Sequence, residues 1–242
     1  KSLGNTAFLT FAGVPITVAA GLLIAIPLAQ NMRGVALYRT LIYLPTLTPA
    51  MVVVLLFLWI FNPNYGLLKA PLDMLGIPSP GWLGDPQWAK IAILGMVVWN
   101  TIGQVMVISL AGLKDIPRHL YEAASIDGAG VWDKFVHVTL PGVSPVLFYN
   151  VLTTLLFFFQ IFTQAYAASY GGAGGGSSGS NIGAPLNSTL MLSLNIYKQA
   201  FVFWQGGYAA MISLVVLFIS FGLALLFFRY ARAYIYYEYS GE

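Results

Sequence analysis

The sequence predicts an all-α membrane protein, a polytopic bundle with five transmembrane helices. Of its 242 residues, 58% are hydrophobic and only 8% are charged, whereas soluble domains carry roughly 25% charged residues. Continuous apolar runs long enough to span a bilayer as helices cover residues 8–30, 41–61, 89–111, 144–168 and 208–228. The interiors of these runs contain no Lys, Arg, Asp or Glu. We therefore expect a single transmembrane domain over residues 1–242, without a separate soluble catalytic domain.

Prolines interrupt the first two runs and begin the fourth. They are Pro15, Pro27, Pro45, Pro49 and Pro145. Each removes a backbone hydrogen bond and favours a kink, which membrane helices tolerate when neighbouring groups satisfy the freed carbonyl. Irregular packing and a hinge remain equally open as interpretations.

The distribution of basic residues predicts the orientation, because cytoplasmic loops carry an excess of Lys and Arg. One side of the bilayer holds Arg33, Arg39, Lys114, Arg118, Lys134, Arg229 and Arg232, and the other holds Lys1, Lys69, Lys90 and Lys198. We expect the first side, with the C-terminus, to be cytoplasmic. A net charge of +3 is too weak to indicate nucleic-acid binding, and the lack of Cys excludes thiolate metal sites.

Two segments on the outer side differ in kind. Residues 62–88 contain turn signals and Trp82 and Trp88, which favours a partly helical cap at the headgroup level. Residues 169–188 include the tract GGAGGGSSGS, whose composition is typical of a flexible loop. No Lys-Ser or Lys-Thr pair follows the tract, so a phosphate-binding loop is not expected there.

The long polar segment at residues 113–141 is predicted to form a helix–turn–helix outside the bilayer. Pro117 begins one helical run, Gly128 and Gly130 mark a break, and a second run starts at Val131. Acidic residues outnumber Lys and Arg in this segment, whereas a helix resting on lipid would have a basic polar face. The segment is therefore predicted to dock on another protein.

The spacing within this segment carries a family resemblance. Glu122-Ala123-Ala124 is followed after three residues by Gly128, and after nine more by Val138-Thr139-Leu140-Pro141. This pattern resembles the EAA loop of ATP-binding-cassette (ABC) importer permeases. Residues 34–68 and 82–124 are similar to the first permease subunit of carbohydrate importers, the maltose and glycerol-phosphate type. Relative to that type the usual first span is missing, the glycine tract is longer, and Val138 replaces Ile.

The resemblance implies a set of partners and a location. It assigns docking on an ATPase to Glu122, Ala123, Ala124, Asp127, Gly128, Leu140 and Pro141. The expected partners are a second permease subunit, two ATP-binding-cassette ATPase subunits, an extracytoplasmic sugar-binding protein, the sugar and membrane lipid. This chain would bind no cofactor itself, since ATP and Mg would be held by the ATPase subunits. The location implied is the bacterial or archaeal cytoplasmic (inner) membrane.

Polar side chains in the third and fourth runs suggest a substrate pathway. Amide and hydroxyl groups bind a neutral polyol, and an aromatic ring covers the apolar face of a sugar. Helix-to-helix hydrogen bonding is the alternative for any one of these residues. Two criteria select the pathway residues: their helical spacing, and the segments that contact substrate in the maltose permeases that this chain resembles. They are Asn100, Thr101, Gln104, Asn150, Thr154, Phe157, Phe158 and Gln160.

The energy source is expected to lie outside this chain. The spans contain no buried Asp, Glu or His of the kind that proton-coupled carriers use, and no Walker-type Gly-Lys-Ser/Thr sequence is present. The predicted function is a sugar-importer permease subunit, a transport subunit rather than an enzyme. A non-transporting membrane scaffold with a docking loop remains the alternative.

Overall fold

The computed structural model describes residues 1–30, 34–172 and 182–234, and all regular structure in these ranges is helical. The long helices are α1 (Ser2–Ala29), α5 (Pro86–Asp115), α8 (Leu140–Phe159) and α11 (Gly206–Tyr234). The shorter helices are α2 (Val35–Leu47), α3 (Ala50–Ile60), α4 (Lys69–Met74), α6 (Arg118–Ile126), α7 (Val131–Lys134), α9 (Thr163–Gly172) and α10 (Leu192–Tyr197). Two π-helical turns, η1 (Phe135–Thr139) and η3 (Lys198–Val202), follow α7 and α10.

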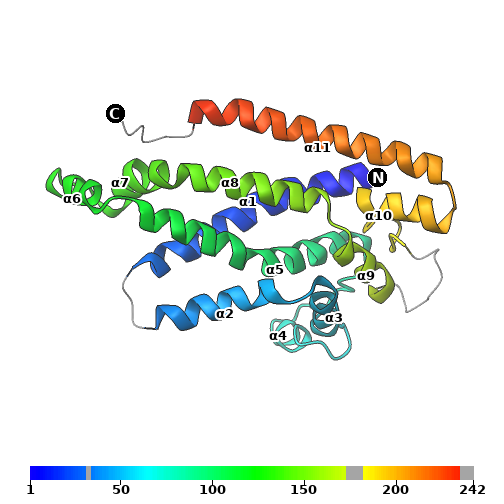
Figure 1. The fold of residues 1–242 in the computed structure, drawn as a ribbon. Helices are drawn as coiled ribbons and strands as arrows, with labels where there is room; N and C mark the ends of the chain where they lie inside the picture. The colour runs from blue at the N-terminus through cyan, green and yellow to red at the C-terminus, as the bar shows by residue number, and fades with distance from the viewer. Residues whose placement is uncertain (31–33, 173–181, 235–242) are drawn as a thin grey trace.

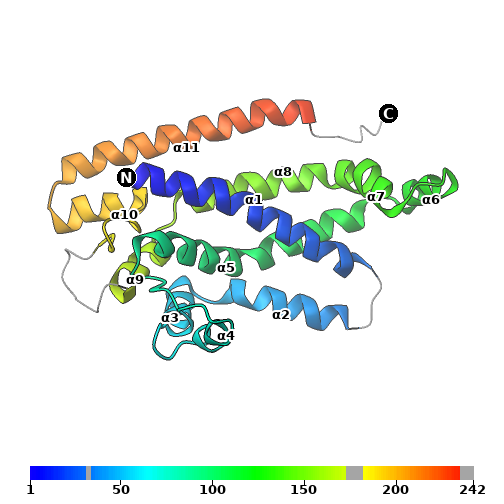
Figure 2. The ribbon, with the colours of Figure 1, turned by 180° about the vertical axis from the view of Figure 1, so that it is seen from behind.

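The long helices lie side by side in an elongated bundle (Figures 1 and 2). One end, here called the α6 end, holds α6, α7, the start of α2 and the C-terminal end of α11. The opposite end, here called the α9 end, holds α9, α10 and the N-terminus. Within the described residues, four helical segments are long and apolar enough to cross a membrane, or five if the bent pair α2 and α3 counts as one span. The predicted all-α bundle is confirmed.

The second apolar run forms a broken span, not one continuous helix. α2 ends at Leu47, and α3 leaves it at an angle of 100°. Thr48 is extended, with a ψ of 128°, because the ring of Pro49 disfavours helical geometry at the preceding residue. The break leaves carbonyl groups at the end of α2 without helical partners.

The fourth apolar run also differs from its predicted bounds of 144–168. α7, η1 and α8 form one helical rod from Val131 to Phe159, and the chain then turns before α9. Pro141 is the second residue after the π turn, so the carbonyl four residues before it lies within that turn. The wider turn accommodates a proline ring that would clash with the carbonyl four residues earlier in a regular helix.

The core lies where α1 packs against α5 and α8. A Cβ atom at Gly13 of α1 would overlap the ring of Phe158, which is 1% exposed. On the other side of α5, a Cβ at Gly103 would lie 2.6 Å from the Ile42 carbonyl oxygen of α2. Glycine at these two positions therefore lets neighbouring helices approach closely, as is typical of membrane bundles.

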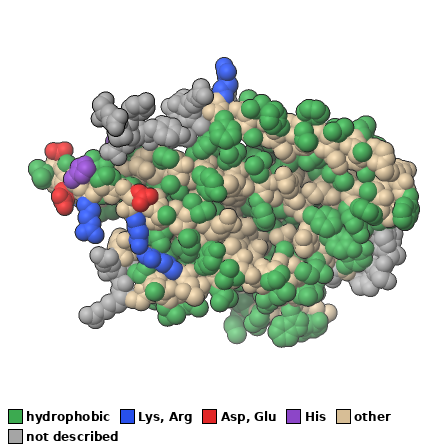
Figure 3. Space-filling model, in the orientation of Figure 1, with side chains coloured by type: hydrophobic (Ala, Val, Ile, Leu, Met, Phe, Trp, Pro, Cys, Tyr) green, Lys and Arg blue, Asp and Glu red, His purple; other side chains and the backbone are tan. Residues whose placement is uncertain are grey.

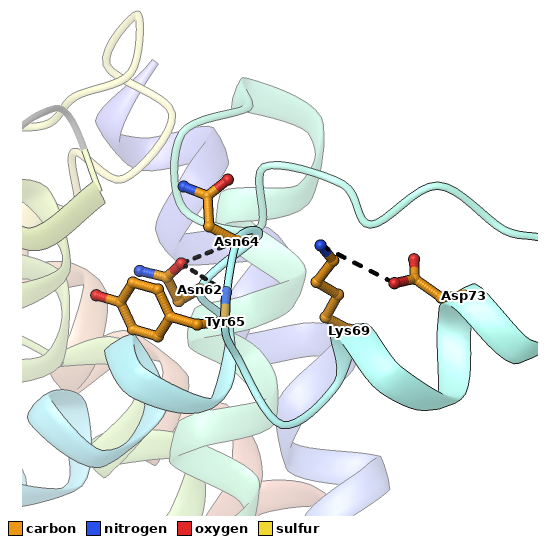
Figure 4. A network of polar contacts seen from close by, with 5 residues as sticks. All are labelled: Asn62, Asn64, Tyr65, Lys69 and Asp73. Atoms are coloured by element: carbon orange, nitrogen blue, oxygen red, sulfur yellow. Dashed lines mark hydrogen bonds and ion pairs between the residues drawn. The ribbon is translucent and has the colours of Figure 1, made fainter.

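The segment at residues 62–88 is partly helical and contains α4. Asn62 opens it as an Asx turn, because its Oδ1 accepts hydrogen bonds from the backbone N–H groups of Asn64 (2.9 Å) and Tyr65 (3.4 Å) (Figure 4). Lys69 and Asp73 form an ion pair of 4.0 Å along α4. The segment ends where the Asp85 carboxylate accepts from the Gln87 N–H at 2.8 Å and caps α5.

The segment at residues 169–188 lies partly outside the described residues, since the tract 173–181 is not described. On its near side α9 continues to Gly172. From α9, Ser169 contacts the residues that follow the tract. Its hydroxyl bonds to the Thr189 hydroxyl at 2.9 Å and accepts from the Gly183 N–H at 3.2 Å. Residues 182–189 are therefore held against α9.

Candidate functional site

A cavity of about 170 Å³ lies between α5 and α8, near the middle of both helices. Its lining combines hydroxyl, amide, aromatic and aliphatic side chains, and includes no ionisable group. The lining residues are Thr101, Gln104, Val105, Ile108, Asn150, Thr153, Thr154 and Phe157. A neutral, polar wall of this kind suits a hydroxyl-rich neutral molecule better than an ion.

Asn150 is the most informative residue of this cavity. Its side chain is fully buried, and its Nδ2 donates to the Ser109 hydroxyl at 3.0 Å. Its Oδ1 has no hydrogen-bond partner among the described residues. Oδ1 has almost no solvent-accessible surface, so it meets a donor such as a sugar hydroxyl only when the cavity opens. That contact then removes a cost of roughly 1–3 kcal/mol for an unsatisfied buried acceptor.

The other polar groups retain acceptor capacity. The Thr101 hydroxyl donates to the Val97 carbonyl at 2.7 Å, and the Thr153 hydroxyl donates to the Tyr149 carbonyl at 2.8 Å. Each hydroxyl oxygen therefore remains free to accept a bond. The Phe157 ring is 44% exposed and presents an apolar surface beside these groups.

Three predicted pathway residues lie outside the cavity. The Nδ2 of Asn100 donates to the carbonyl oxygens of Pro45 (2.7 Å) and Thr48 (3.4 Å), so Asn100 satisfies the broken end of α2. Phe158 lies in the core against Gly13, and Gln160 is exposed at the C-terminal cap of α8. The cavity thus brings together Thr101, Gln104, Asn150, Thr154 and Phe157.

The pathway residues predicted from the sequence do not include Val105, Ile108 and Thr153, which line the cavity, or Ser109, whose hydroxyl accepts from Asn150. Helical spacing held a signal for two of them, since positions 101, 104, 105 and 108 share one face of a helix. The Ser109 contact depends on the register between α5 and α8, which no single segment of sequence encodes.

The segment at residues 113–141 forms a helix–turn–helix at the α6 end. Gly128, with a φ of +77°, makes the turn after α6, and the Ala129 N–H bonds to the Ala124 carbonyl at 2.9 Å. Such a left-handed residue after a helix satisfies its last carbonyls and favours glycine. The Tyr121 and Thr139 hydroxyls bond at 3.0 Å and tie α6 to η1.

The tip of this unit is open to contact. Ile126 is 87% exposed and Val131 is 90% exposed, and large apolar side chains exposed together mark interaction surfaces. Glu122, Ala123, Asp127 and Gly128 are also exposed, Ala124 is half-buried, and Leu140 and Pro141 lie at the start of α8, away from the tip. Among the described residues, no group of three His, Cys, Asp or Glu side chains is placed to hold a metal ion.

Comparisons with known proteins agree with this architecture. The chain is 35% identical over 241 residues to the probable ABC transporter permease protein YesP of Bacillus subtilis, covering 98% of this chain and 74% of that protein. It is 34% identical to the lactose transport system permease protein LacF of Rhizobium radiobacter, covering 96% of this chain and 76% of that protein.

The fold also matches solved structures. A chain from a bacterial ABC transporter involved in the import of the acidic polysaccharide alginate superposes with a TM-score of 0.76 at 19% identity, covering 96% of this chain and 78% of that one. The family model of binding-protein-dependent transport system inner membrane components matches residues 17–233. The expected resemblance is thereby confirmed, and the chain belongs to the family of binding-protein-dependent transport system inner membrane components.

Proposed function

We propose that this chain forms half of the transmembrane pathway for a sugar in an ATP-driven importer. The observation that carries the proposal is the unpartnered Oδ1 of Asn150, fully buried in a neutral polar cavity. Membership of a transport-system family favours a permease over the alternative of a non-transporting scaffold.

The chemistry of the cavity supports a sugar as the substrate class. Hydroxyls of the sugar bond to the Asn150, Thr154 and Gln104 side chains, and the Phe157 ring covers a C–H face. Relatives named for lactose and diacetylchitobiose transport support the same class. The volume of about 170 Å³ is below the roughly 300–1,000 Å³ of complete ligand sites, which fits a half-site that a second permease subunit completes.

The helix–turn–helix at the α6 end couples this pathway to energy. Its exposed tip docks on one of two separate ATPase subunits, which hold ATP and Mg; this chain binds no cofactor itself. Glu122 supplies a charge contact there, and Gly128 sets the turn. Because η1 and α8 continue directly from α7, a displacement of the tip is transmitted along α8 to Asn150 and Phe157. ATP-driven movement then switches the cavity between the two sides.

Orientation follows from the same scheme. Arg39, Lys114, Arg118, Lys134 and Arg229 lie toward the α6 end, and Lys69, Lys90 and Lys198 toward the α9 end. The α6 end and the C-terminal end of α11 therefore face the cytoplasm. The α9 end receives the sugar from an extracytoplasmic binding protein at the bacterial or archaeal inner membrane.

The decisive experiment is ATP hydrolysis by the complex purified with its co-eluting partners, screened against sugars with their binding protein. One sugar is expected to stimulate hydrolysis. If no sugar stimulates hydrolysis or is taken up by vesicles that contain the complex, the permease proposal fails and the scaffold alternative gains support.

Substitution of Asn150 then tests the cavity itself. Asn150→Leu keeps the volume but removes the acceptor, so the sugar concentration for half-maximal stimulation is expected to rise about tenfold, the worth of roughly one net hydrogen bond. Asn64→Leu, in the exposed segment before α4, is the matched control and should leave that concentration unchanged. An unchanged value in Asn150→Leu would contradict the assignment of the cavity.

A further inference from the structure

A second hollow, here called the basic groove, opens at the α6 end. It has a volume of about 960 Å³ and lies between the last turns of α1 and α5 and the segment from α6 to η1. Its apolar walls include Leu23, Ile26 and Trp132, and its cations are Lys114, Arg118 and Lys134. Figure 3 shows Lys and Arg side chains gathered toward this end of the molecule.

The three cations of the basic groove have no ionic partner in the described part of the chain. The ion pair found within 4.0 Å there joins Lys69 to Asp73, far from the groove on α4. No acidic residue lines the groove. Asp115 and Asp133 are next to Lys114 and Lys134 in sequence, and Glu122 is four residues after Arg118. None of these carboxylates lines the groove or forms an ion pair in the described residues, and that of Asp133 accepts a hydrogen bond from the Gly130 N–H at 3.1 Å. Three positive side chains that line one groove and form no ion pair in the described residues favour an anionic ligand.

The groove lies at the depth of a bilayer interface. Lys114 is in the last turn of α5, and Leu23 and Ile26 are within two turns of the end of α1, both spans by length and composition. Leu23 is 64% exposed on the outside of α1, and Trp132 is 72% exposed beside the cations. Tryptophan and basic residues are typical of the headgroup level, and exposed leucine of the acyl-chain level.

We propose that the basic groove binds an anionic phospholipid. The phosphate lies among Lys114, Arg118 and Lys134, and an acyl chain follows Leu23 and Ile26 along α1. A partner protein that meets the tip of α6 and α7 contacts Ile126, which does not line the groove, and Val131, which also lines it; both are exposed. The apolar walls Leu23 and Ile26 instead belong to α1, a span by length and composition. Basic pockets at the ends of spans recognise acidic headgroups in this manner. The lipid anchors the helix–turn–helix to the ends of α1 and α5.

Native mass spectrometry of the detergent-solubilised full complex tests this site. Phosphatidylglycerol is expected to remain bound, and phosphatidylcholine, which carries the same phosphodiester without net charge, is expected to dissociate. The triple variant Lys114→Gln, Arg118→Gln, Lys134→Gln should lower the apparent affinity for phosphatidylglycerol about 100-fold, since each basic residue near a membrane surface contributes roughly fivefold. The matched variant Lys1→Gln, Lys69→Gln, Lys90→Gln removes the same charge at the other end and should retain the lipid.

Other outcomes would overturn the proposal. Equal retention of both lipids, or full retention by the triple variant, contradicts an anionic-lipid site. Competition by inorganic phosphate at the same concentration as lipid identifies a free-anion site instead, and loss of ATPase subunits from the triple variant with its lipid retained identifies a protein contact. The charge-retaining variant Lys114→Arg, Lys134→Arg should bind as the parent, which separates charge from folding. Because lipid binding is measured without sugar or ATP, its failure is distinguishable from failure of the proposed transport function.

Discussion

Two buried asparagines, Asn100 and Asn150, differ in their hydrogen bonding. Both Asn100 and Asn150 are almost inaccessible and lie on the interior of membrane helices. The Nδ2 of Asn100 bonds two carbonyls at the end of α2, whereas the Oδ1 of Asn150 lacks a partner within the described residues. The same residue type therefore stabilises a helix break in one place and offers a free acceptor in the other.

Asn100→Leu is expected to destabilise the protein without changing sugar recognition. The substitution removes the bond to the Thr48 carbonyl and one of the two bonds to the Pro45 carbonyl, which also accepts from the Thr48 N–H at 3.1 Å. The loss of these bonds costs about 1–3 kcal/mol. Thermal unfolding of the purified complex should show the loss, and the half-saturating sugar concentration should stay at the parental value. A large rise in that concentration with unaltered unfolding would restore Asn100 to the substrate pathway.

At the scale of elements, the third span was predictable in position and the second was predictable only in part. Asp85 followed by Pro86 is a local cap signal, and α5 begins at Pro86. Pro49 predicts an interruption of the second run, but not the bend of 100°. At the break, Asn100, which lies 52 residues beyond Thr48, donates to the Pro45 and Thr48 carbonyls. Local sequence therefore indicates where a helix weakens, whereas the partner of its freed carbonyls comes from a distant part of the chain.

The cavity was predictable to a similar degree. Helical periodicity placed Gln104, Thr154 and Phe157 on polar faces, and the structure brings these faces together. Periodicity could not separate Phe157 from Phe158, because adjacent positions on a helix differ by about 100° and only packing against Gly13 decides which ring is buried. The interhelical register supplies the missing information.

The turn between α6 and α7 carries the next prediction. Gly128→Val places a β-branched residue at a φ of +77°, which costs about 1–2 kcal/mol or more and displaces the turn. Sugar-stimulated ATP hydrolysis should fall sharply, while the permease subunits still co-purify with each other. Gly76→Val imposes a similar strain at a φ of +68° in the segment at residues 62–88, just after α4, with nothing within 4 Å of the added Cβ. If sugar stimulates ATP hydrolysis equally in the two variants, the turn at Gly128 does not couple the ATPase to the pathway.

At the scale of the whole molecule, the two ends and the middle of the bundle carry different kinds of site. The α6 end carries the helix–turn–helix and the basic groove, the middle carries the neutral cavity, and the α9 end carries the segments that anchor α1. Asn5 of α1 holds that end, since its Nδ2 donates to the Asn187 carbonyl at 2.8 Å and to the Leu190 carbonyl at 3.1 Å. An importer needs two different ends, because the substrate arrives at one end and energy enters at the other.

The difference between the two ends predicts how the chain is oriented in the membrane. The 242 residues contain no Cys, so one introduced cysteine is the sole thiol of this chain. Ile126 at the α6 end and Met74 at the opposite side of the bundle are both 87% exposed, which makes Ile126→Cys and Met74→Cys a matched pair. A membrane-impermeant maleimide should label the cysteine at position 126 only in inside-out vesicles, and that at position 74 only in right-side-out vesicles. Both should react after detergent is added, and the reverse pattern would place the α6 end outside the cell, where no ATPase could use it.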